Sequence, residues 1–348
     1  DSSDDGAFID SDGDGLLELG SCVSWTQPGG DRICPAATGA ARAGTLPATK
    51  SNCNCEPFFI EIEILPELTL EKEVINDDGG TLVDTDWTLT ATGPETIEGQ
   101  EGDPAITGAG VLIGTYTLSE NTLPGYAQEG DWVCVDNGTS ASFPVSNGNQ
   151  IALASGDKVT CTVTNDDIRP ELTVIKHVVN DDGGSAVASE FTMQVTAANP
   201  DDGEFPGAES PGTTIGVDAG AYSVDEADFP GYSKSLSADC SGTIAVGETK
   251  TCTITNDDIA PTLTLIKTVV GGTATAADFQ AYIDDVAVDW ETAYTLTAGP
   301  HTAREDLFSG YEAGMWGTDC AADGSITLGL AENKTCTITN TYVMRDET

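Results

Sequence analysis

One set of residues recurs three times along this chain in the same order, and it constrains the fold more than any other feature. Each copy has a lysine closing an apolar segment, then a glutamate, a Gly-Tyr pair, a cysteine and a final Cys-x-x-x-Asn segment. The three lysine segments read LTLEK, LTVIK and LTLIK. The copies recur every ~90 to 100 residues, the usual size of one domain.

Short runs of Thr, Val, Ile and Tyr alternate with other residues and are separated by Gly, Pro, Asn and Asp. This pattern is typical of an all-β sandwich, and we expect about seven strands in each repeat. We predict repeats over residues 66–168, 169–259 and 260–348. Residues 1–65 form a different, small unit that is rich in Asp, Gly and Cys, is mostly β, and ends in an alternating strand over 58–65.

Two kinds of connection are also predicted. Residues 76–80 and 180–184 both read Asn-Asp-Asp-Gly-Gly after the first strand of a repeat, which predicts hairpin turns; the third repeat keeps only Gly271-Gly272. The junctions over 165–170 and 256–261 are short and end in proline, which resists bending. We therefore expect a rod rather than flexibly linked beads.

The charge excludes several classes of partner. With 58 acidic and 13 basic residues the formal net charge is -45, so nucleic acid and anionic membranes would be repelled. A charged, solvated surface that keeps an exposed protein soluble explains this excess, and a cation or a cationic surface is the alternative. No apolar run approaches the ~18 residues of a membrane helix, and no signal peptide or sorting motif is visible, so we expect a mature or truncated extracellular chain without membrane insertion.

Ten cysteines indicate an oxidising compartment. Six of them form one pair in each repeat, and closing each loop by a disulfide contributes about 3 kcal/mol in the chain-entropy model. Metal ligation competes poorly, because His is nearly absent and no Cys-x-x-Cys occurs. The predicted pairs are Cys134 with Cys161, Cys240 with Cys252, Cys320 with Cys336, and Cys22 with Cys34. Cys53 and Cys55 stay unassigned.

Strand parity directs three kinds of polar side chain into the core of every repeat, because residues two apart share a face. The lysine follows apolar residues on the first strand, the glutamate follows them on a middle strand, and the asparagine follows the cysteine on the last strand. The three sets are Lys72, Glu120 and Asn165; Lys176, Glu226 and Asn256; and Lys267, Glu305 and Asn340. In the third repeat His301 replaces the middle-strand residues Tyr116 and Tyr222.

These side chains are suited to an amide exchange. Burial favours an uncharged, nucleophilic lysine amine and a protonated glutamic acid. The amine would attack the asparagine carbonyl, the glutamate would polarise that carbonyl and transfer protons, and ammonia would leave. The alternative is that the lysines extend to solvent and the asparagines only form turns.

With this set of residues in this order, the repeats resemble the collagen-adhesin B-type and pilin-type domains of microbial surface proteins, which have a prealbumin-like, Ig-like sandwich fold. In that family a lysine of the first strand joins an asparagine of the last strand, assisted by a glutamate before Gly-Tyr. The resemblance covers about residues 66–343 and implies isopeptides from Lys72 to Asn165, Lys176 to Asn256 and Lys267 to Asn340. The added cysteine pairs and His301 depart from the pattern.

Two further motifs stay open. Asp10, Asp12 and Asp14 form a D-x-D-x-D-G segment that matches the start of a calcium loop, although Ser21 stands where the closing Glu belongs; a plain acidic turn is the alternative. No cofactor is otherwise required. Asn137 and Asn333 begin glycosylation triplets, which are common by chance.

We therefore expect a structural subunit of an extracellular surface filament or stalk, which is not an enzyme acting on an outside substrate. It would self-associate, with the 58–65 strand as a candidate donor to an open sheet edge of another copy. The alternative is an adhesin for a glycan or a host protein, with Trp25, Trp132 or Trp316 on its loops.

Overall fold

The computed structural model describes residues 23–24, 53–54 and 64–344 of the 348. Within the first two ranges, strand β1 (Val23–Ser24) pairs antiparallel with β2 (Cys53–Asn54). Several sequence predictions lie outside the described residues: the calcium loop at Asp10, Asp12 and Asp14, the Cys22–Cys34 disulfide, Trp25 and the strand over 58–63.

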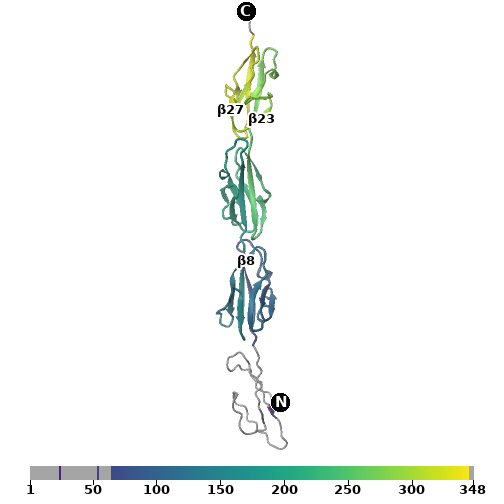
Figure 1. The fold of residues 1–348 in the computed structure, drawn as a ribbon, viewed down its shortest axis with the longest axis vertical. Coiled ribbons are helices and arrows are strands. Elements are labelled where there is room, and N and C mark those ends of the chain that lie inside the picture. Colours follow the sequence, from purple (N-terminus) through teal and green to yellow (C-terminus); the bar gives the residue numbers. More distant parts are fainter. Residues whose placement is uncertain (1–22, 25–52, 55–63, 345–348) are drawn as a thin grey trace. The chain divides into compact units, whose positions relative to one another are not determined.

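The described chain divides into two compact units. The first contains the residues up to Ile75 together with Leu82–Leu123 and Ala127–Asp166, and it holds the first sandwich. The second contains Asn76–Thr81, Pro124–Tyr126 and the chain from Asp167 onward, and it holds the second and third sandwiches. The three sets of strands follow the colour gradient of Figure 1 from blue to yellow.

The first sandwich packs a sheet of order β6-β3-β11-β8-β9 against a sheet of order β10-β7-β4-β5. Its elements are β3 (Glu67–Ile75), η1 (Asp84–Asp86), β4 (Leu89–Thr92), β5 (Thr96–Gly99), β6 (Ala109–Gly110), β7 (Gly114–Glu120), β8 (Tyr126–Asp136), β9 (Ser142–Phe143), β10 (Gln150–Leu153) and β11 (Lys158–Asp167).

The second sandwich has sheets of order β15-β12-β19-β17 and β14-β13-β16-β18. Its elements are β12 (Glu171–Val179), η2 (Ala188–Glu190), β13 (Thr192–Thr196), β14 (Glu204–Pro206), β15 (Thr213–Gly216), β16 (Gly220–Glu226), β17 (Tyr232–Leu236), η3 (Ala238–Cys240), β18 (Ser241–Ile244) and β19 (Thr249–Asp258).

The third sandwich has sheets of order β23-β20-β28-β25, with β26 also on β28, and β22-β21-β24-β27. Its elements are β20 (Thr262–Val270), η4 (Ala276–Asp278), β21 (Ala281–Ile283), β22 (Val286–Val288), β23 (Ala293–Thr295), β24 (Gly299–Glu305), β25 (Tyr311–Ala313), β26 (Gly317–Thr318), β27 (Ser325–Leu328) and β28 (Asn333–Tyr342). The all-β prediction is therefore confirmed, and none of the helices among the described residues is long and apolar enough to cross a bilayer.

The first and last strands of each sandwich are parallel neighbours. β3 pairs with β11, β12 with β19, and β20 with β28, and the register is the same in all three pairs. Each lysine lies opposite an apolar residue two positions before the asparagine, because the strand partners of Lys72, Lys176 and Lys267 are Val163, Ile254 and Ile338. This common register places each asparagine two residues beyond its lysine, on the same face of the sheet.

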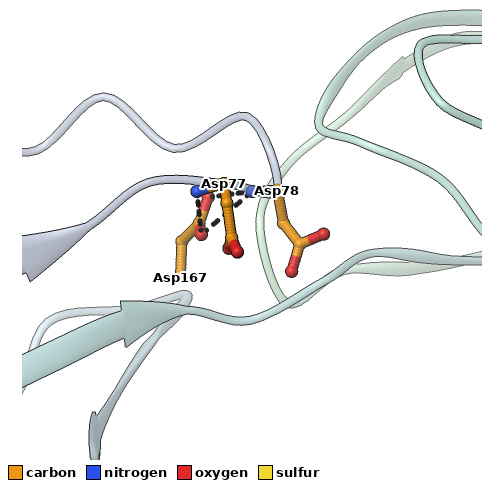
Figure 2. A group of neighbouring side chains, drawn as sticks. All are labelled: Asp77, Asp78 and Asp167. Carbon is orange, nitrogen blue, oxygen red and sulfur yellow. Dashed lines mark hydrogen bonds between the residues drawn. The ribbon is translucent and has the colours of Figure 1, made fainter.

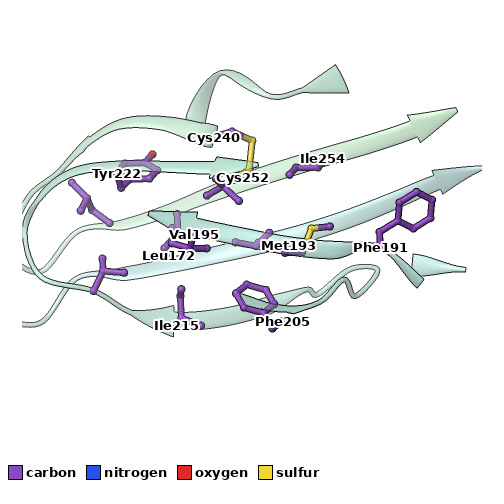
Figure 3. Close-up of a cluster of buried hydrophobic side chains, with 14 residues drawn as sticks. Leu172, Phe191, Met193, Val195, Phe205, Ile215, Tyr222, Cys240, Cys252 and Ile254 are labelled. Carbon is purple, nitrogen blue, oxygen red and sulfur yellow. A yellow bond between two sulfur atoms is a disulfide. The ribbon is translucent and has the colours of Figure 1, made fainter. Parts of the chain in front are cut away.

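The core of each sandwich lies between its two sheets. In the second sandwich Leu172, Phe191 and Met193 are almost completely inaccessible, and the Cys240–Cys252 disulfide belongs to the same buried cluster (Figure 3). The alternation of buried and partly exposed residues along β12 follows from the two faces of a strand. Burying a side chain such as Leu or Phe contributes about 1.5–3 kcal/mol, so this face holds the sheets together.

The two Asn-Asp-Asp-Gly-Gly segments are not hairpin turns as predicted. The strand before each segment and the strand after it lie in different sheets, so the segment connects the two layers. Long-range hydrogen bonds fix its conformation: the Asp167 carboxylate accepts the backbone N–H groups of Asp77 and Asp78 (Figure 2). It also accepts the N–H of Gly80. Gly79 supplies a positive φ of 90°. Tertiary contacts therefore replace the expected local turn.

The second repeat uses the same arrangement, which we call the aspartate clamp. Asp258 accepts the N–H groups of Asp181, Asp182 and Gly184. In both repeats the tyrosine of the Gly-Tyr pair donates its hydroxyl to the side-chain oxygen of the asparagine that begins the segment, Tyr126 to Asn76 and Tyr232 to Asn180, at 2.5 Å. The Gly-Tyr pair of the repeated set thus belongs to this clamp.

Candidate functional site

The three repeated lysines are buried at equivalent strand positions. Lys72, Lys176 and Lys267 are 4%, 0% and 7% exposed, and the side chain of each is completely inaccessible. The alternation on the first strand turns them inward together with the apolar residues that precede them. The lysines therefore do not extend to solvent.

Each lysine contacts the glutamate that ends a strand of the facing sheet. The distance from Nζ to Oε2 is 3.3 Å between Lys72 and Glu120 and 3.4 Å between Lys176 and Glu226. Lys267 makes the same contact with Glu305. These pairs cross the core from one sheet to the other, so the packing of the two layers positions them.

Each asparagine is also buried, on the strand next to the lysine. Asn165, Asn256 and Asn340 are 1–3% exposed, and the side-chain carbonyl oxygen of each lacks a hydrogen-bond partner in the structure. In the third repeat Asn340 Nδ2 donates to Glu305 Oε1 over 2.7 Å, so Glu305 bridges asparagine and lysine directly. An unpaired buried amide oxygen costs free energy, and such groups are rare in folded proteins.

An aromatic ring that the sequence analysis missed covers each lysine. The distance from Nζ to the ring centroid is 4.9 Å at Trp87, 4.1 Å at Phe191 and 4.2 Å at Phe279. In the third repeat Trp290 adds a second ring at 5.6 Å and donates its indole N–H to the carbonyl oxygen of Phe279. The ring face attracts an ammonium and also excludes water from it.

The sequence does contain a signal for these rings. Each directly follows an acidic residue that ends a short 3-10 turn after the first strand, in the pairs Asp86-Trp87, Glu190-Phe191 and Asp278-Phe279. The acidic side chain accepts the backbone N–H at the start of its own turn and fixes the approach of the ring. A recurring acidic-aromatic pair is therefore part of the repeated set.

Burial lowers the pKa of all three lysines from the ordinary value of a lysine. The neighbouring glutamate acts in the opposite direction in each site but does not cancel the effect. The cause is the loss of hydration of the ammonium, which penalises the charged form. The uncharged amine, which is the nucleophilic form, is thus more populated here than it would be on the surface.

The three cysteine pairs predicted within the repeats are disulfides in the structure. They join Cys134 to Cys161, Cys240 to Cys252 and Cys320 to Cys336. All six residues are buried. The second cysteine of each pair precedes the asparagine by four residues on the last strand, so the disulfide and the polar site share one strand and one face.

The other candidate residues lie apart from this site. Asn137 is exposed in the turn between β8 and β9, and Asn333 begins β28, where its Oδ1 accepts the hydroxyl of Thr262. Trp132 does not lie on a loop as predicted; Trp316 does, between β25 and β26, but neither is an exposed aromatic. Trp132 is 3% exposed within β8, and Trp316 is 9% exposed and stacks on Trp290, because both fill the space between sheets.

The family model of the prealbumin-like fold domain matches three stretches of the chain, residues 65–163, 167–260 and 257–338. The chain belongs to this family. The prealbumin-like domain therefore occurs here in three tandem copies, as the resemblance of the repeats implied. A search of curated proteins found no match to the chain.

Solved structures to which the chain is similar include three bacterial proteins. The Bacillus anthracis TIE protein is 16% identical with a TM-score of 0.42, over 78% of this chain and 50% of that one. The pilus adhesin SpaC of Lactobacillus rhamnosus GG is 14% identical with a TM-score of 0.28, over 86% and 46%. The major pilin T-13 of Streptococcus pyogenes is 14% identical with a TM-score of 0.24, over 57% and 98%. This chain spans about half the length of the first two.

Proposed function

We propose that this chain is a structural subunit of an extracellular microbial surface filament or stalk, in which an intramolecular Lys–Asn isopeptide closes each prealbumin-like repeat. One observation carries the proposal. Three separate cores each enclose a lysine in contact with a glutamate and, on the neighbouring strand, an asparagine whose carbonyl oxygen is unpaired. A buried ionic pair is costly to retain without further compensation, so its threefold recurrence favours a chemical role.

The reaction is an amide exchange within one repeat. The uncharged Nζ of the lysine attacks Cγ of the asparagine, the Nζ–Cγ bond forms and the Cγ–Nδ2 bond breaks. The glutamic acid donates its proton toward the amide, accepts a proton from the attacking nitrogen, and ammonia leaves with Nδ2. Glu305 already contacts both reacting groups. Because the fold holds the reactants together, folding already supplies much of the entropy cost of bringing them into contact, and the barrier of the chemical step is lower.

The product suits its surroundings better than the reactants do. A secondary amide carries no charge, so the cost of the buried ammonium disappears, and the glutamic acid stays available as a hydrogen-bond partner. The crosslink joins the first strand of the repeat to its last strand. Such a closed repeat resists proteases, heat and tension, which are the demands on an extracellular filament.

The second part of the proposal concerns the role of the whole chain at the cell surface. Two of the solved structures reported above are a pilus adhesin and a major pilin, and we assign a role of that kind to this chain as part of the proposal. Self-association, with the 58–65 segment as the donated strand, belongs to the same proposal. The adhesin alternative lacks support from Trp132 and Trp316, which are buried.

Intact-mass measurement of the fully reduced chain tests the crosslink. Each isopeptide lowers the mass by one ammonia, so three crosslinks give a deficit of three ammonia molecules. Replacing Asn256→Ala should restore one of them, and proteolytic fragments should then carry free Lys176. A full-length mass without any deficit would reject the proposal.

Lys234→Met is the matched control in the second repeat. Lys234 lies opposite Asn256 on the strand β17, but its ammonium binds Asp225 and the backbone oxygen of Glu226 instead of reaching the core site. The deficit should therefore stay at three ammonia molecules in this variant. A deficit reduced by one would show that the wrong lysine has been assigned.

A further inference from the structure

In all three disulfides one cysteine occupies an equivalent position, while the position of the other cysteine differs. The equivalent cysteine lies on the last strand, four residues before the asparagine, and is Cys161, Cys252 or Cys336. The other partner is Cys134 in β8, Cys240 in η3, or Cys320 after β26. The sequence separations are 27, 12 and 16 residues. The common property of the bridges is thus an anchored last strand.

The anchored position is in register with the crosslinking site. Cys252 lies opposite Val174 on the parallel first strand, two residues before Lys176, and Asn256 lies opposite Val178, two residues after it. Cys161 and Asn165, and Cys336 and Asn340, bracket their lysines in the same way. Figure 3 shows the Cys240–Cys252 bridge in the core beside Ile254, the residue opposite the lysine.

This register is essential for the chemistry. A slip of the last strand by one residue would turn the asparagine to the outer face, and a slip by two would carry it ~6–7 Å along the strand. Before the isopeptide exists, backbone hydrogen bonds and side-chain packing are the other restraints on that slip. A covalent anchor four residues away removes it.

We propose that the disulfide of each repeat gates its crosslink, by holding the last strand in the register that brings the asparagine to the lysine. The inference rests on the proposed isopeptide and concerns its regulation. The cysteines are positioning residues, because they act through the strand and not on the reacting atoms. A chain whose thiols stay reduced therefore keeps its sites open, and oxidation starts the crosslinking.

The two steps balance separately. Two cysteine thiols lose two protons and two electrons to a small-molecule disulfide such as oxidised glutathione, which becomes two thiols. The amide exchange then proceeds without any redox change, with Nζ–Cγ bond formation and release of ammonia. Oxidant is consumed in the first step alone, so the order of events can be followed experimentally.

The test uses the full chain, prepared and purified with all thiols reduced. One half is kept in reductant and the other receives oxidised glutathione, and ammonia loss is followed by intact mass after complete reduction of both. We expect ammonia loss to be up to about 100-fold faster in the oxidised half, the factor that misplacement by about 1 Å can cost. Equal rates in the two halves, or an ammonia deficit already complete in the reduced chain, would overturn the gating proposal and leave the isopeptide intact. A mass without any ammonia deficit in either half would reject the isopeptide itself.

A repeat-specific variant covers the case in which the reduced chain unfolds. In Cys240→Ala/Cys252→Val, the apolar replacements retain core packing, and the first and third repeats serve as internal controls in the same oxidised molecule. We expect the second repeat alone to crosslink slowly, while hydrogen exchange shows it to be folded. Crosslinking at the rate of its neighbours would overturn the proposal.

A destabilising variant away from the last strand separates positioning from stability. Ile244→Ala removes buried side-chain atoms from β18, in the sheet that faces β19, and leaves the disulfide in place. Crosslinking of the second repeat should keep its normal rate in this variant. A slowing equal to that of the cysteine variant would show that general stability is responsible, and would overturn the gating role.

Discussion

The second and third repeats have the same buried site but different supports at the end of the sandwich. In the second repeat Asp258 is 4% exposed and accepts three backbone N–H groups of the Asn180–Gly184 segment. In the third repeat Tyr342 stands at the equivalent position, is 44% exposed and packs edge-on against Tyr311. The lysine, glutamate and asparagine are nevertheless buried in both.

This difference shows that the buried site and the order of the connection at the end of the sandwich depend on different residues. The site depends on the pairing of the first and last strands and on the facing glutamate, which both repeats have. The aspartate clamp orders a connection between sheets, and the third repeat, whose connection is shorter, does without it. Tyr311 accepts the N–H of Ala274, as Tyr232 accepts that of Ala186, but it donates its hydroxyl to the carbonyl oxygen of Gly271 instead of to an asparagine side chain.

The largest expected effect comes from removing the crosslink in either repeat. Lys176→Met and Lys267→Met should each lower the free energy of unfolding of their own repeat by about 4–5 kcal/mol, from the loop-closure entropy of a long crosslinked segment. The slowest-exchanging amides of β19 and β28 would report these losses by hydrogen exchange. The controls are Lys250→Met and Lys334→Met, which change equivalent, partly exposed lysines on the same two strands. A loss in one repeat only would break the equivalence of the two sites.

A smaller effect is expected from removing the aspartate clamp. Asp258→Ala leaves three N–H groups without their charged acceptor and should cost about 3 kcal/mol, whereas Asp257→Ala, at the exposed neighbouring residue, should cost under about 0.5 kcal/mol. Thermal unfolding and hydrogen exchange of the 180–184 segment would measure both. The ammonia deficit of Asp258→Ala should remain complete. If the crosslink of the second repeat were lost as well, the separation of site and clamp would be wrong.

The smallest effect concerns pH and the third repeat alone. His301 replaces Tyr222 of the second repeat and binds the Asp284 carboxylate at 2.6 Å and the backbone oxygen of Thr297 at 2.7 Å. Burial acts to lower the pKa of His301, but these two hydrogen bonds outweigh it and the pKa is raised. A raised pKa means that the stabilisation is complete below the pKa of the unfolded chain and is lost as the pH rises through the higher pKa of the folded state.

Compared with wild type, His301→Tyr should therefore lose about 0.5–1 kcal/mol of stability in the third repeat at acidic pH. The difference should shrink as the pH rises above the ordinary histidine pKa of about 6.5. Repeat-resolved hydrogen exchange at several pH values would measure it, and the second repeat should show no difference between the two proteins. A difference independent of pH would mean that the ring packing of His301, and not its charge, stabilises the repeat.

Parity was sufficient to predict much of the candidate site. Because side chains alternate along a strand, the positions of Lys72 and Asn165 after apolar residues were enough to place both in a core. The rings of Trp87 and Phe191 were missed, because they come from a short 3-10 turn, where no simple periodicity assigns a face. Their repeated acidic neighbour was the available signal.

Connections were predicted less well than strands. The Asn76–Gly80 segment has the composition of a hairpin turn, but its conformation is set by Asp167, about 90 residues away in sequence. The sequence separation hides such a contact from local propensity. The short edge strands β6 and β9 were also unpredictable, because two residues cannot show alternation. The repeats contain eight or nine strands, whereas about seven were expected.

The parallel pairing of the first and last strands has a mechanical consequence once the proposed crosslink is in place. Tension that enters at the start of β12 would pass along it to Lys176, across the new amide to Asn256, and out of the domain at the end of β19. The 79 or so residues between them, with the Cys240–Cys252 bridge, would lie outside the path of the force. A pulled molecule would therefore break at ordinary covalent-bond strength before its sheets separate, and its disulfides would carry no load.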